Sequence, residues 1–379
     1  MKEIIYADNA ATERLSSDAL KAMTPWLTSE YGNASQPYFS GLRAHASVES
    51  ARETVSGLIG ASPDEIFFTS GGTESDNWAI RRFFRPDGEA RIIVSSVEHH
   101  AVLDACREAA IERRGKTAAE TVPVDKDGVV DADVLSASIG RGGTIPTLVS
   151  VMLANNEIGT VEPVGKLAER AHARSAYFHT DAVAAVGKIP IDVGELGVDM
   201  LSASAHKFGG PQGMGFLYIK NGTPLSPFFF GGAQERSMRA GTENVAGIVG
   251  TAAALKSRVD GMKKANGVLV KLEERLLSRL CGADFIRNGA KERIPGLLSL
   301  SFRGADGETI LHRLDLKGIA VSTGAACDSV RTEVSHVIRA IGVPEEYAKG
   351  TVRISLGVDN TEREVDRIAA EIIEIIKDR

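Results

Sequence analysis

The sequence has few of the residues that would indicate a secreted, metal-binding or membrane-embedded protein. Only three of its 379 residues are cysteines (Cys106, Cys281 and Cys327), and their spacing matches no zinc or redox motif, so we expect neither a disulfide framework nor a metal site. No apolar run approaches the ~20 residues that a membrane helix needs, and the first residues lack the apolar stretch of a secretory signal. We therefore expect a cytoplasmic protein that does not bind membranes.

The sequence also lacks a surplus of positive charge. It has 44 Lys and Arg against 50 Asp and Glu, a net charge of −6. A general nucleic-acid binder would need a broad positive field, so we expect no direct binding to nucleic acid. The hydrophobic fraction of 43% and the charged fraction of 25% are those of an ordinary globular protein.

Short apolar runs alternate with helical patterns through the first two thirds of the chain. The runs cover residues 66–70, 92–95, 148–154, 177–180, 200–203 and 215–219, and residues 97–115 show apolar side chains at helical spacing. This alternation predicts an α/β fold with a largely parallel central sheet.

The last third has a different pattern. We expect helices over residues 246–264 and 268–281, strands over 297–302 and 318–322, and a final amphipathic helix. Thr361 and Glu364 have the spacing of a capping box at the start of that helix. The change of pattern places a domain boundary near residue 260.

Two segments contain residues that a phosphate-bearing cofactor would need. In Phe68-Thr-Ser-Gly-Gly-Thr-Glu-Ser-Asp-Asn77 a strand runs into two glycines and a helix start, where backbone N–H groups could bind a phosphate. An ordinary strand–turn–helix connection would also explain this loop. Asp181 follows a strand and could keep a pyridine nitrogen protonated; a helix N-cap is the alternative.

Lys207 supplies the third feature. It follows the apolar strand that ends in Ser202-Ala-Ser-Ala-His206. A lysine in such a place could have a lowered pKa and form a Schiff base with a cofactor, whereas most lysines are simply exposed to solvent. The order of phosphate loop, aspartate and lysine favours a single cofactor site.

These motifs and others along the chain resemble those of the NifS/IscS-type cysteine desulfurases, which are class V, fold-type I pyridoxal-phosphate enzymes. The resemblance runs nearly end to end. Its motifs are Tyr6-Ala-Asp-Asn-Ala-Ala-Thr12, the phosphate loop, Glu98-His99, Asn155-Asn-Glu-Ile-Gly159, Asp181, His206-Lys207, Met238-Arg-Ala-Gly-Thr242, Ser322-Thr-Gly-Ala-Ala-Cys327 and Val352-Arg-Ile-Ser-Leu-Gly357. The resemblance implies a large cofactor-binding domain at residues 14–260. It also implies a smaller α+β domain, made of residues 1–13 and 261–379, that carries the cysteine loop.

The resemblance also implies how pyridoxal 5′-phosphate is held. Lys207 would bind it covalently, Asp181 would contact its ring nitrogen, and His99 would stack on the ring and assist proton transfer. The remaining contacts would come from Asn156 near the ring and from Gly72, Thr73, Ser204 and His206 at the phosphate. Thr242 would reach the phosphate of a neighbouring subunit, which implies a homodimer.

For the substrate, the resemblance implies L-cysteine. Arg353 would bind its carboxylate, Asn33 would lie on the substrate side, and Cys327 would take its sulfur as a persulfide and leave L-alanine. A sulfur-acceptor protein would follow, serving iron–sulfur assembly, tRNA thiolation or DNA phosphorothioation. By contrast, we expect Cys106 and Cys281 to be packed in the core.

The chain departs from the family pattern at two places. Ala184 stands where the family usually has a glutamine that contacts the phenolic oxygen of the cofactor. Residues 32–39 lack the usual histidine. Two alternatives stay open: a selenocysteine lyase or other class V aminotransferase, and a non-catalytic, cofactor-binding scaffold protein.

Overall fold

A seven-stranded sheet forms the centre of the larger part of the molecule. The computed structural model describes residues 4–83, 88–112, 116–324 and 334–378. The strand order is β2-β8-β7-β6-β5-β3-β4; β8 runs antiparallel to its neighbours β2 and β7, and the other pairs are parallel. The strands are β2 (Ile66–Thr69), β3 (Ala90–Ser95), β4 (Thr117–Val122), β5 (Thr147–Ser150), β6 (Tyr177–Asp181), β7 (Met200–Ser204) and β8 (Gly215–Ile219). The predicted α/β fold with a largely parallel sheet is confirmed.

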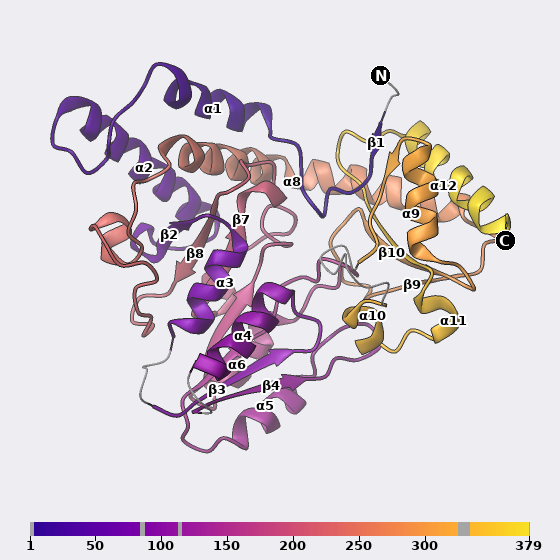
Figure 1. Cartoon of the computed structure of the whole chain (residues 1–379), viewed down its shortest axis with the longest axis horizontal. Helices are drawn as coiled ribbons and strands as arrows, with labels where there is room; N and C mark the ends of the chain where they lie inside the picture. Colours follow the sequence, from indigo (N-terminus) through magenta and orange to yellow (C-terminus); the bar gives the residue numbers. More distant parts are fainter. Residues whose placement is uncertain (1–3, 84–87, 113–115, 325–333, 379) are drawn as a thin grey trace.

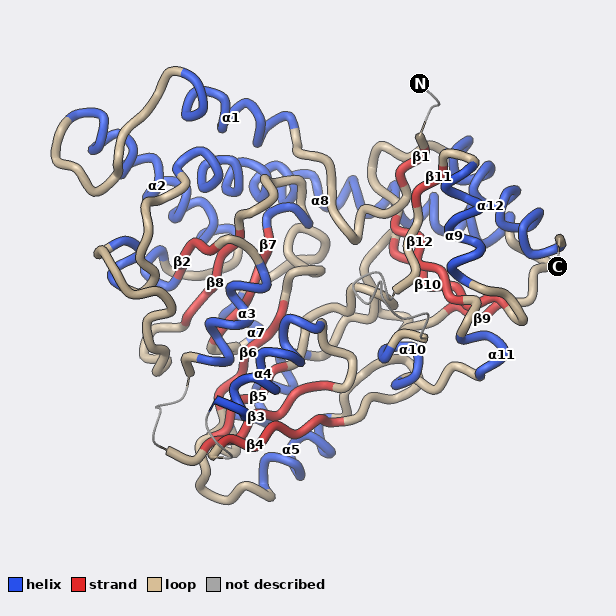
Figure 2. The backbone as a smooth tube through the Cα atoms, in the orientation of Figure 1, coloured by secondary structure: helices blue, strands red, loops and turns tan. Residues whose placement is uncertain are grey.

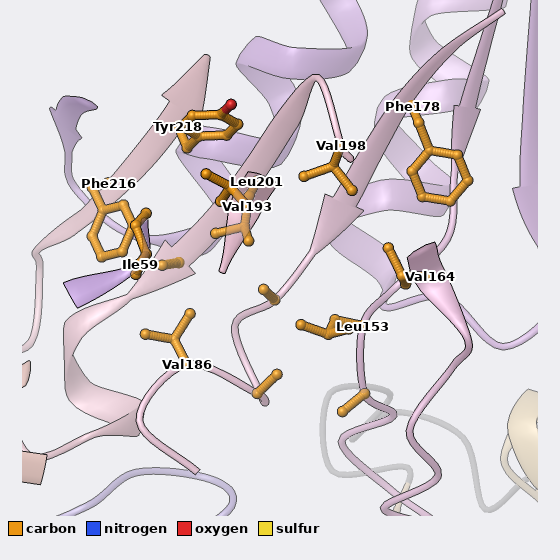
Figure 3. Packing of buried hydrophobic residues seen from close by; sticks show 14 of the residues in the cluster. Ile59, Leu153, Val164, Phe178, Val186, Val193, Val198, Leu201, Phe216 and Tyr218 are labelled. Atoms are coloured by element: carbon orange, nitrogen blue, oxygen red, sulfur yellow. The ribbon is translucent and has the colours of Figure 1, made fainter. Parts of the chain in front are cut away.

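Helices cover both faces of this sheet (Figures 1 and 2). On one face Phe178, Leu201 and Phe216 pack against α2, α5, α6 and the start of α8, as the close view shows in part (Figure 3). On the other face Trp78 of α3 and Cys106 of α4 pack against the strands. The helices around this sheet are α1 (Ser17–Thr28), α2 (Phe39–Leu58), α3 (Gly72–Arg81), α4 (His100–Glu112), α5 (Ala132–Gly140), α6 (Val164–His172) and α7 (Val193–Leu196). Burial on both faces explains why the strands read as continuous apolar runs.

A second core lies around a smaller three-stranded sheet of order β12-β10-β9. The N-terminal strand β1 also packs in this core, although it is distant in sequence. Ile5 of β1 pairs with Ile319 of β11 in a separate two-stranded sheet. The elements are β1 (Ile5–Tyr6), β9 (Phe285–Arg287), β10 (Leu297–Phe302), β11 (Ile319–Ala320), β12 (Thr351–Ser355), α9 (Gly307–Leu316), α10 (His336–Ala340), α11 (Glu345–Ala348) and α12 (Glu362–Lys377).

One helix, α8 (Val245–Arg279), replaces the two helices predicted over residues 246–281. Leu255, Met262, Leu269 and Leu276 recur every seven residues on its buried side, so packing continues through residues 265–267, which separate the two predicted helices. Gly267 faces open space, and tertiary packing outweighs its low helix propensity. Leu255 belongs to the first core and Leu269 to the second. Residue 260 therefore lies inside a helix that contacts both cores, and the division into domains stays a prediction.

The capping box at the start of α12 is present as predicted. The Thr361 hydroxyl accepts the Glu364 N–H at 3.3 Å, and Glu364 Oε2 accepts the Thr361 N–H at 2.7 Å. Among the described residues, no helix has the length and apolar character needed to cross a membrane.

Thr361→Ala is expected to lower the free energy of unfolding by about 1 kcal/mol, because one helix N–H loses its acceptor. Urea denaturation of the two proteins measures the difference. Thr54→Ala on the exposed side of α2 is the control and should change stability less. Equal stability of Thr361→Ala and the parent chain would show that the cap contributes nothing.

Candidate active site

The candidate site lies where β6, β7 and the start of α3 meet. Asp181 ends β6 and is paired in register with Ser202 of β7. Lys207 follows in a 3-10 turn, Ala205–Lys207, directly after β7. Because the carboxyl ends of parallel strands share one edge of the sheet, the fold brings together side chains that are 26 residues apart in sequence.

The turn before α3 and Ser204 form a cradle that suits a phosphate. Gly71 has a φ of +148°, and a Cβ built on it would lie 3.5 Å from Ser204 Oγ. A Cβ on Gly72 would lie only 2.4 Å from Val183 Cγ2, so a larger residue would displace its neighbours. Gly72 and the exposed Thr73 form the first turn of α3, where unpaired backbone N–H groups and the helix dipole favour an anion. The structure thus brings Gly72, Thr73 and Ser204 together.

Lys207 is held by the N-terminal segment of the chain. Its Nζ donates to the carbonyl oxygens of Ala10 at 2.6 Å and Ala11 at 2.8 Å. Burial, and then the positive charge of Arg353, lowers the pKa of Lys207 to about 8. A larger fraction of the amine is therefore free, and nucleophilic, near neutral pH than in an exposed lysine.

The lowered pKa of Lys207 predicts how cofactor uptake depends on pH. Only the deprotonated amine can attack an aldehyde, so uptake should accelerate as the pH rises and level off above about 8. An unperturbed lysine would still be accelerating near pH 10. Stopped-flow measurement of pyridoxal-phosphate binding to the cofactor-free protein tests this, and a rate that keeps rising to pH 10 would contradict it.

His206 and Thr12 stand next to this amine. The Thr12 hydroxyl lies 3.1 Å from His206 Nδ1. Burial, and then the charge of Lys207, lowers the pKa of His206 to about 4, so the imidazole is neutral at neutral pH. A neutral His206 can bind a phosphate only as an N–H donor.

Asp181 and His99 form the acid–base part of the site. Asp181 is 4% exposed, and its Oδ1 accepts the Val183 N–H at 2.8 Å. Burial raises the pKa of Asp181, and the positive charges of His99 and Lys207 act against that rise. A protonated ring nitrogen placed beside Asp181 would stabilise its anion in the same way. Burial lowers the pKa of His99. Its Nδ1 accepts the Ala101 N–H at 3.0 Å, so the neutral ring carries its proton on Nε2.

A buried polar layer behind Asp181 was not expected from the sequence. His179 bridges Ser150 (Oγ to Nδ1, 2.8 Å) and Ser202 (Oγ to Nε2, 2.9 Å). Burial, and then the charge of Asp181, raises the pKa of Asp76 well above its usual range. Burial lowers the pKa of His179 to about 3. His179 is therefore neutral at neutral pH, and burial together with the charge of Asp181 favours the protonated form of Asp76.

Arg353 links this site to the second core. It is 5% exposed; its guanidinium contacts Asp8 Oδ1 at 2.8 Å and donates to the Asn156 carbonyl at 3.0 Å. Its backbone pairs with Ser322 in both directions, at 2.6 and 3.1 Å. Ala184 and Lys207 both line one small cavity. The contacts of Asp8, Ala10, Ala11 and Thr12 were missed from the sequence, although the motif that contains them was recognised.

The three cysteines have different surroundings. Cys327 lies outside the described residues, which stop at Gly324 and resume at residue 334. A Cβ on Gly324 would lie 2.1 Å from Glu157 Oε2, so a larger residue here would have to displace the Glu157 carboxyl group. Cys106 is buried as predicted, whereas Cys281 is exposed and the prediction for it was wrong. The leucines beside Cys281, Leu276 and Leu280, take up the buried positions instead.

For two predicted site residues, Asn33 and Thr242, the described residues show no hydrogen bond to Lys207. α1 begins where the Ser16 N–H donates to Gly209 at 2.8 Å, and Asn33 follows its far end, about 18 Å along a helix of 12 residues. Thr242 is exposed, and its side chain makes no hydrogen bond to the described residues. The site contacts that the resemblance implies for Asn33 and Thr242 therefore stay predictions.

Comparison with known proteins places the chain among the class V aminotransferases and their relatives. The family model described as aminotransferase class-V matches residues 5–368. A protein named cysteine desulfurase IscS from Methanosarcina thermophila is 44% identical, over 98% of this chain and 92% of the relative. A protein of the same name from Dictyoglomus turgidum is 45% identical, over 97% and 93%.

Two solved structures resemble the whole fold. One, described as a NifS-like protein, has a TM-score of 0.91 and 38% identity and covers 100% of both chains. Another, described as SspA in complex with cysteine, has a TM-score of 0.82 and 30% identity, covering 94% of this chain and 100% of the other. With a family model that matches nearly its whole length, and with the lysine, aspartate and phosphate cradle brought to one edge of the sheet, the chain belongs to the class V aminotransferase family.

Proposed function

We propose that the chain is a cysteine desulfurase, which converts L-cysteine into L-alanine and transfers the sulfur to Cys327 as a persulfide. One observation carries the proposal most directly: the pKa of Lys207 is lowered, and its amine interacts electrostatically with both Asp181 and Arg353. An amine, a buried acid and a guanidinium are what binding a pyridoxal cofactor and an amino acid together requires. The names of the relatives, and the related structure that contains cysteine, support this choice of substrate.

The family uses pyridoxal phosphate, and the residues present fit it. Gly72, Thr73, Ser204 and His206 would hold the phosphate, and Lys207 the aldehyde carbon. Asp181 would bind the ring nitrogen, with His99 at the ring face and Asn156 near its substituents. When bound, this cofactor withdraws electrons from the substrate's α-carbon.

The chain's own residues would perform the other steps. Arg353 would bind the substrate carboxylate with donors left over from its contacts to Asp8 and Asn156. Once displaced by the substrate amine, Lys207 would take the α-proton, and His99 would present its Nε2 proton. The Cys327 thiolate would attack the substrate sulfur, forming an S–S bond as the C–S bond breaks. The electron pair of the C–S bond would go to the β-carbon, which gains a proton and becomes the methyl group of alanine.

A homodimer would complete the site. Three large side chains from the end of α1 to the first residue of α2 are unusually exposed: Tyr31 (84%), Tyr38 (54%) and Phe39 (76%). An apolar surface of this kind is typical of a protein interface, and a second copy of the chain is the partner that we propose. It would cover the segment that contains Asn33, and Thr242 would reach the phosphate bound by the other subunit. A cytoplasmic sulfur-acceptor protein would then take the outer sulfur atom of the Cys327 persulfide.

Incubating the cofactor-loaded protein with L-cysteine and a thiol reductant tests this function. The parent chain should form alanine and sulfide in equal amounts, and Cys327→Ser should form neither. Cys281→Ser is the matched control, because that thiol is exposed and should be dispensable. Cofactor binding without turnover would favour a scaffold protein. Turnover of L-selenocysteine alone would favour a lyase, and alanine from Cys327→Ser would remove this thiol from the reaction.

A further inference from the structure

Residues 235–237 form a left-handed turn without any glycine. Glu235, Arg236 and Ser237 have φ angles of 44°, 55° and 64°. In this region the Cβ atom crowds the backbone carbonyl oxygen. Elsewhere in the described residues, only Ser175 among non-glycine residues has a positive φ. Such strain persists only where the surrounding structure imposes it, and it is often found at functional sites.

The side chain of Glu235 holds this turn in place. It is 7% exposed, and its two oxygens accept hydrogen bonds from the Arg52 guanidinium at 2.8 and 3.0 Å. Oε2 also accepts the Phe68 N–H at 3.0 Å. Arg52 lies on α2 and Phe68 on β2, the strand that leads into the phosphate cradle. The turn is therefore attached to the core beside the chain's own cofactor site.

The residues that follow the turn are fixed as well. Arg239 pairs with Glu74 of α3 at 2.9 Å, and Gln234 Oε1 accepts the Gly241 N–H at 3.1 Å. The backbone is thus tied on both sides of the turn up to Gly241. The next side chain, Thr242, is exposed.

We propose that Glu235 and Arg52 are positioning residues that hold Thr242 ready for the phosphate in the partner subunit. This inference rests on the proposed homodimer. A hydroxyl contributes more to phosphate binding when little conformational entropy is lost in ordering it. The hydrogen-bonded turn orders the segment around Thr242 before the partner's cofactor binds. Both Arg52 and Glu235 are buried, so neither can touch the phosphate.

Mixed dimers separate an effect across the interface from an effect within one chain. Two differently tagged chains are coexpressed, and dimers that carry both tags are purified. Lys207→Ala in one chain leaves a single site that can bind the cofactor covalently, and its visible absorbance gives the dissociation constant. In dimer one, Glu235→Gln is on the Lys207→Ala chain; in dimer two, it is on the chain that keeps Lys207.

The cofactor should dissociate about tenfold more readily from dimer one than from the parent arrangement, the loss expected for one hydrogen bond to a charged group. Dimer two should keep the parent affinity. Weakening in dimer two alone, or in neither dimer, would overturn the inference. Asp366→Asn, which weakens a partly exposed ion pair between α12 and Arg275 of α8, is the control and should have no effect in either arrangement.

Thr242→Ala in the same two arrangements tests the proposed dimer contact separately. If it has no effect across the interface, the contact itself is wrong. If Thr242→Ala acts across the interface and Glu235→Gln does not, only the positioning inference fails. Should Glu235→Gln not fold, the double variant Arg52→Met and Glu235→Met replaces the buried ion pair with apolar side chains, which proteins often tolerate. It should give the same pattern.

Discussion

Lys207→Ala is expected to prevent covalent attachment of the cofactor and to lower the rate of alanine formation at least about 1000-fold. The variant loses both the nucleophilic amine and the base that would receive the α-proton, and each such role contributes orders of magnitude in rate. The visible absorbance of the purified protein and a product assay with L-cysteine measure the two effects. The cofactor's phosphate contacts are unchanged, so weak noncovalent binding should persist.

Lys188→Met is the matched control for this prediction. Lys188 is also largely buried, and burial lowers its pKa, but its Nζ pairs with Glu13. Arg258 pairs with Glu13 too, so the acid keeps a partner in the variant. Lys188→Met should retain the covalently bound cofactor. Loss of the cofactor from Lys188→Met alone would show that Lys207 has been assigned the wrong role.

Asp181→Asn is expected to lower kcat by about 100-fold to 1000-fold with a smaller change in KM. A neutral amide cannot stabilise a protonated ring nitrogen, and losing a preorganised electrostatic partner of the reacting group typically costs this much. Asp181→Glu keeps the charge and should recover part of the rate. Steady-state kinetics, together with the pH titration of the bound cofactor's absorbance, measure the effect.

Asp76→Asn tests whether the effect is specific to Asp181. Burial and the charge of Asp181 raise the pKa of Asp76 and favour its protonated form, so an amide of the same shape should change kcat by less than about threefold. A large loss in Asp76→Asn would mean that the negative charge resides on Asp76 instead. Equal losses in both variants would indicate a shared charge.

Local motifs predicted the parts of the site that depend on residue type. The glycine pair before α3, the acid after β6 and the lysine after β7 could be found because each has a characteristic strand-end context. The contacts of residues 8–12 could not be found, because Ala10 and Ala11 bind Lys207 through backbone carbonyls, which every residue has. Asp8 is separated from Arg353 by 345 residues, and no local pattern encodes that distance.

For the fold as well, local sequence patterns predicted some elements, and long-range packing decided others. The apolar runs of β3, β5, β6 and β7 predicted a largely parallel sheet, whereas β4 (Thr117–Val122) was missed because an edge strand with Thr, Ala and Glu has little apolar periodicity. The sequence predicted two helices separated at residues 265–267, but burial of Leu255 and Leu269 on the same side keeps α8 continuous. Propensity is a local preference of a few tenths to 1 kcal/mol per residue, and packing of a long amphipathic face exceeds it.

The sequence by itself determined the fold class, the family and the candidate positions Asp181 and Lys207, because strand periodicity and short motifs are local properties of the chain. Only the tertiary structure decided that Lys207 is half-buried against the N-terminal segment, that the pKa of Asp76 is raised beside Asp181, and that Glu235 anchors a left-handed turn. Burial and charge proximity set pKa values and backbone strain, and both depend on residues that meet only after folding.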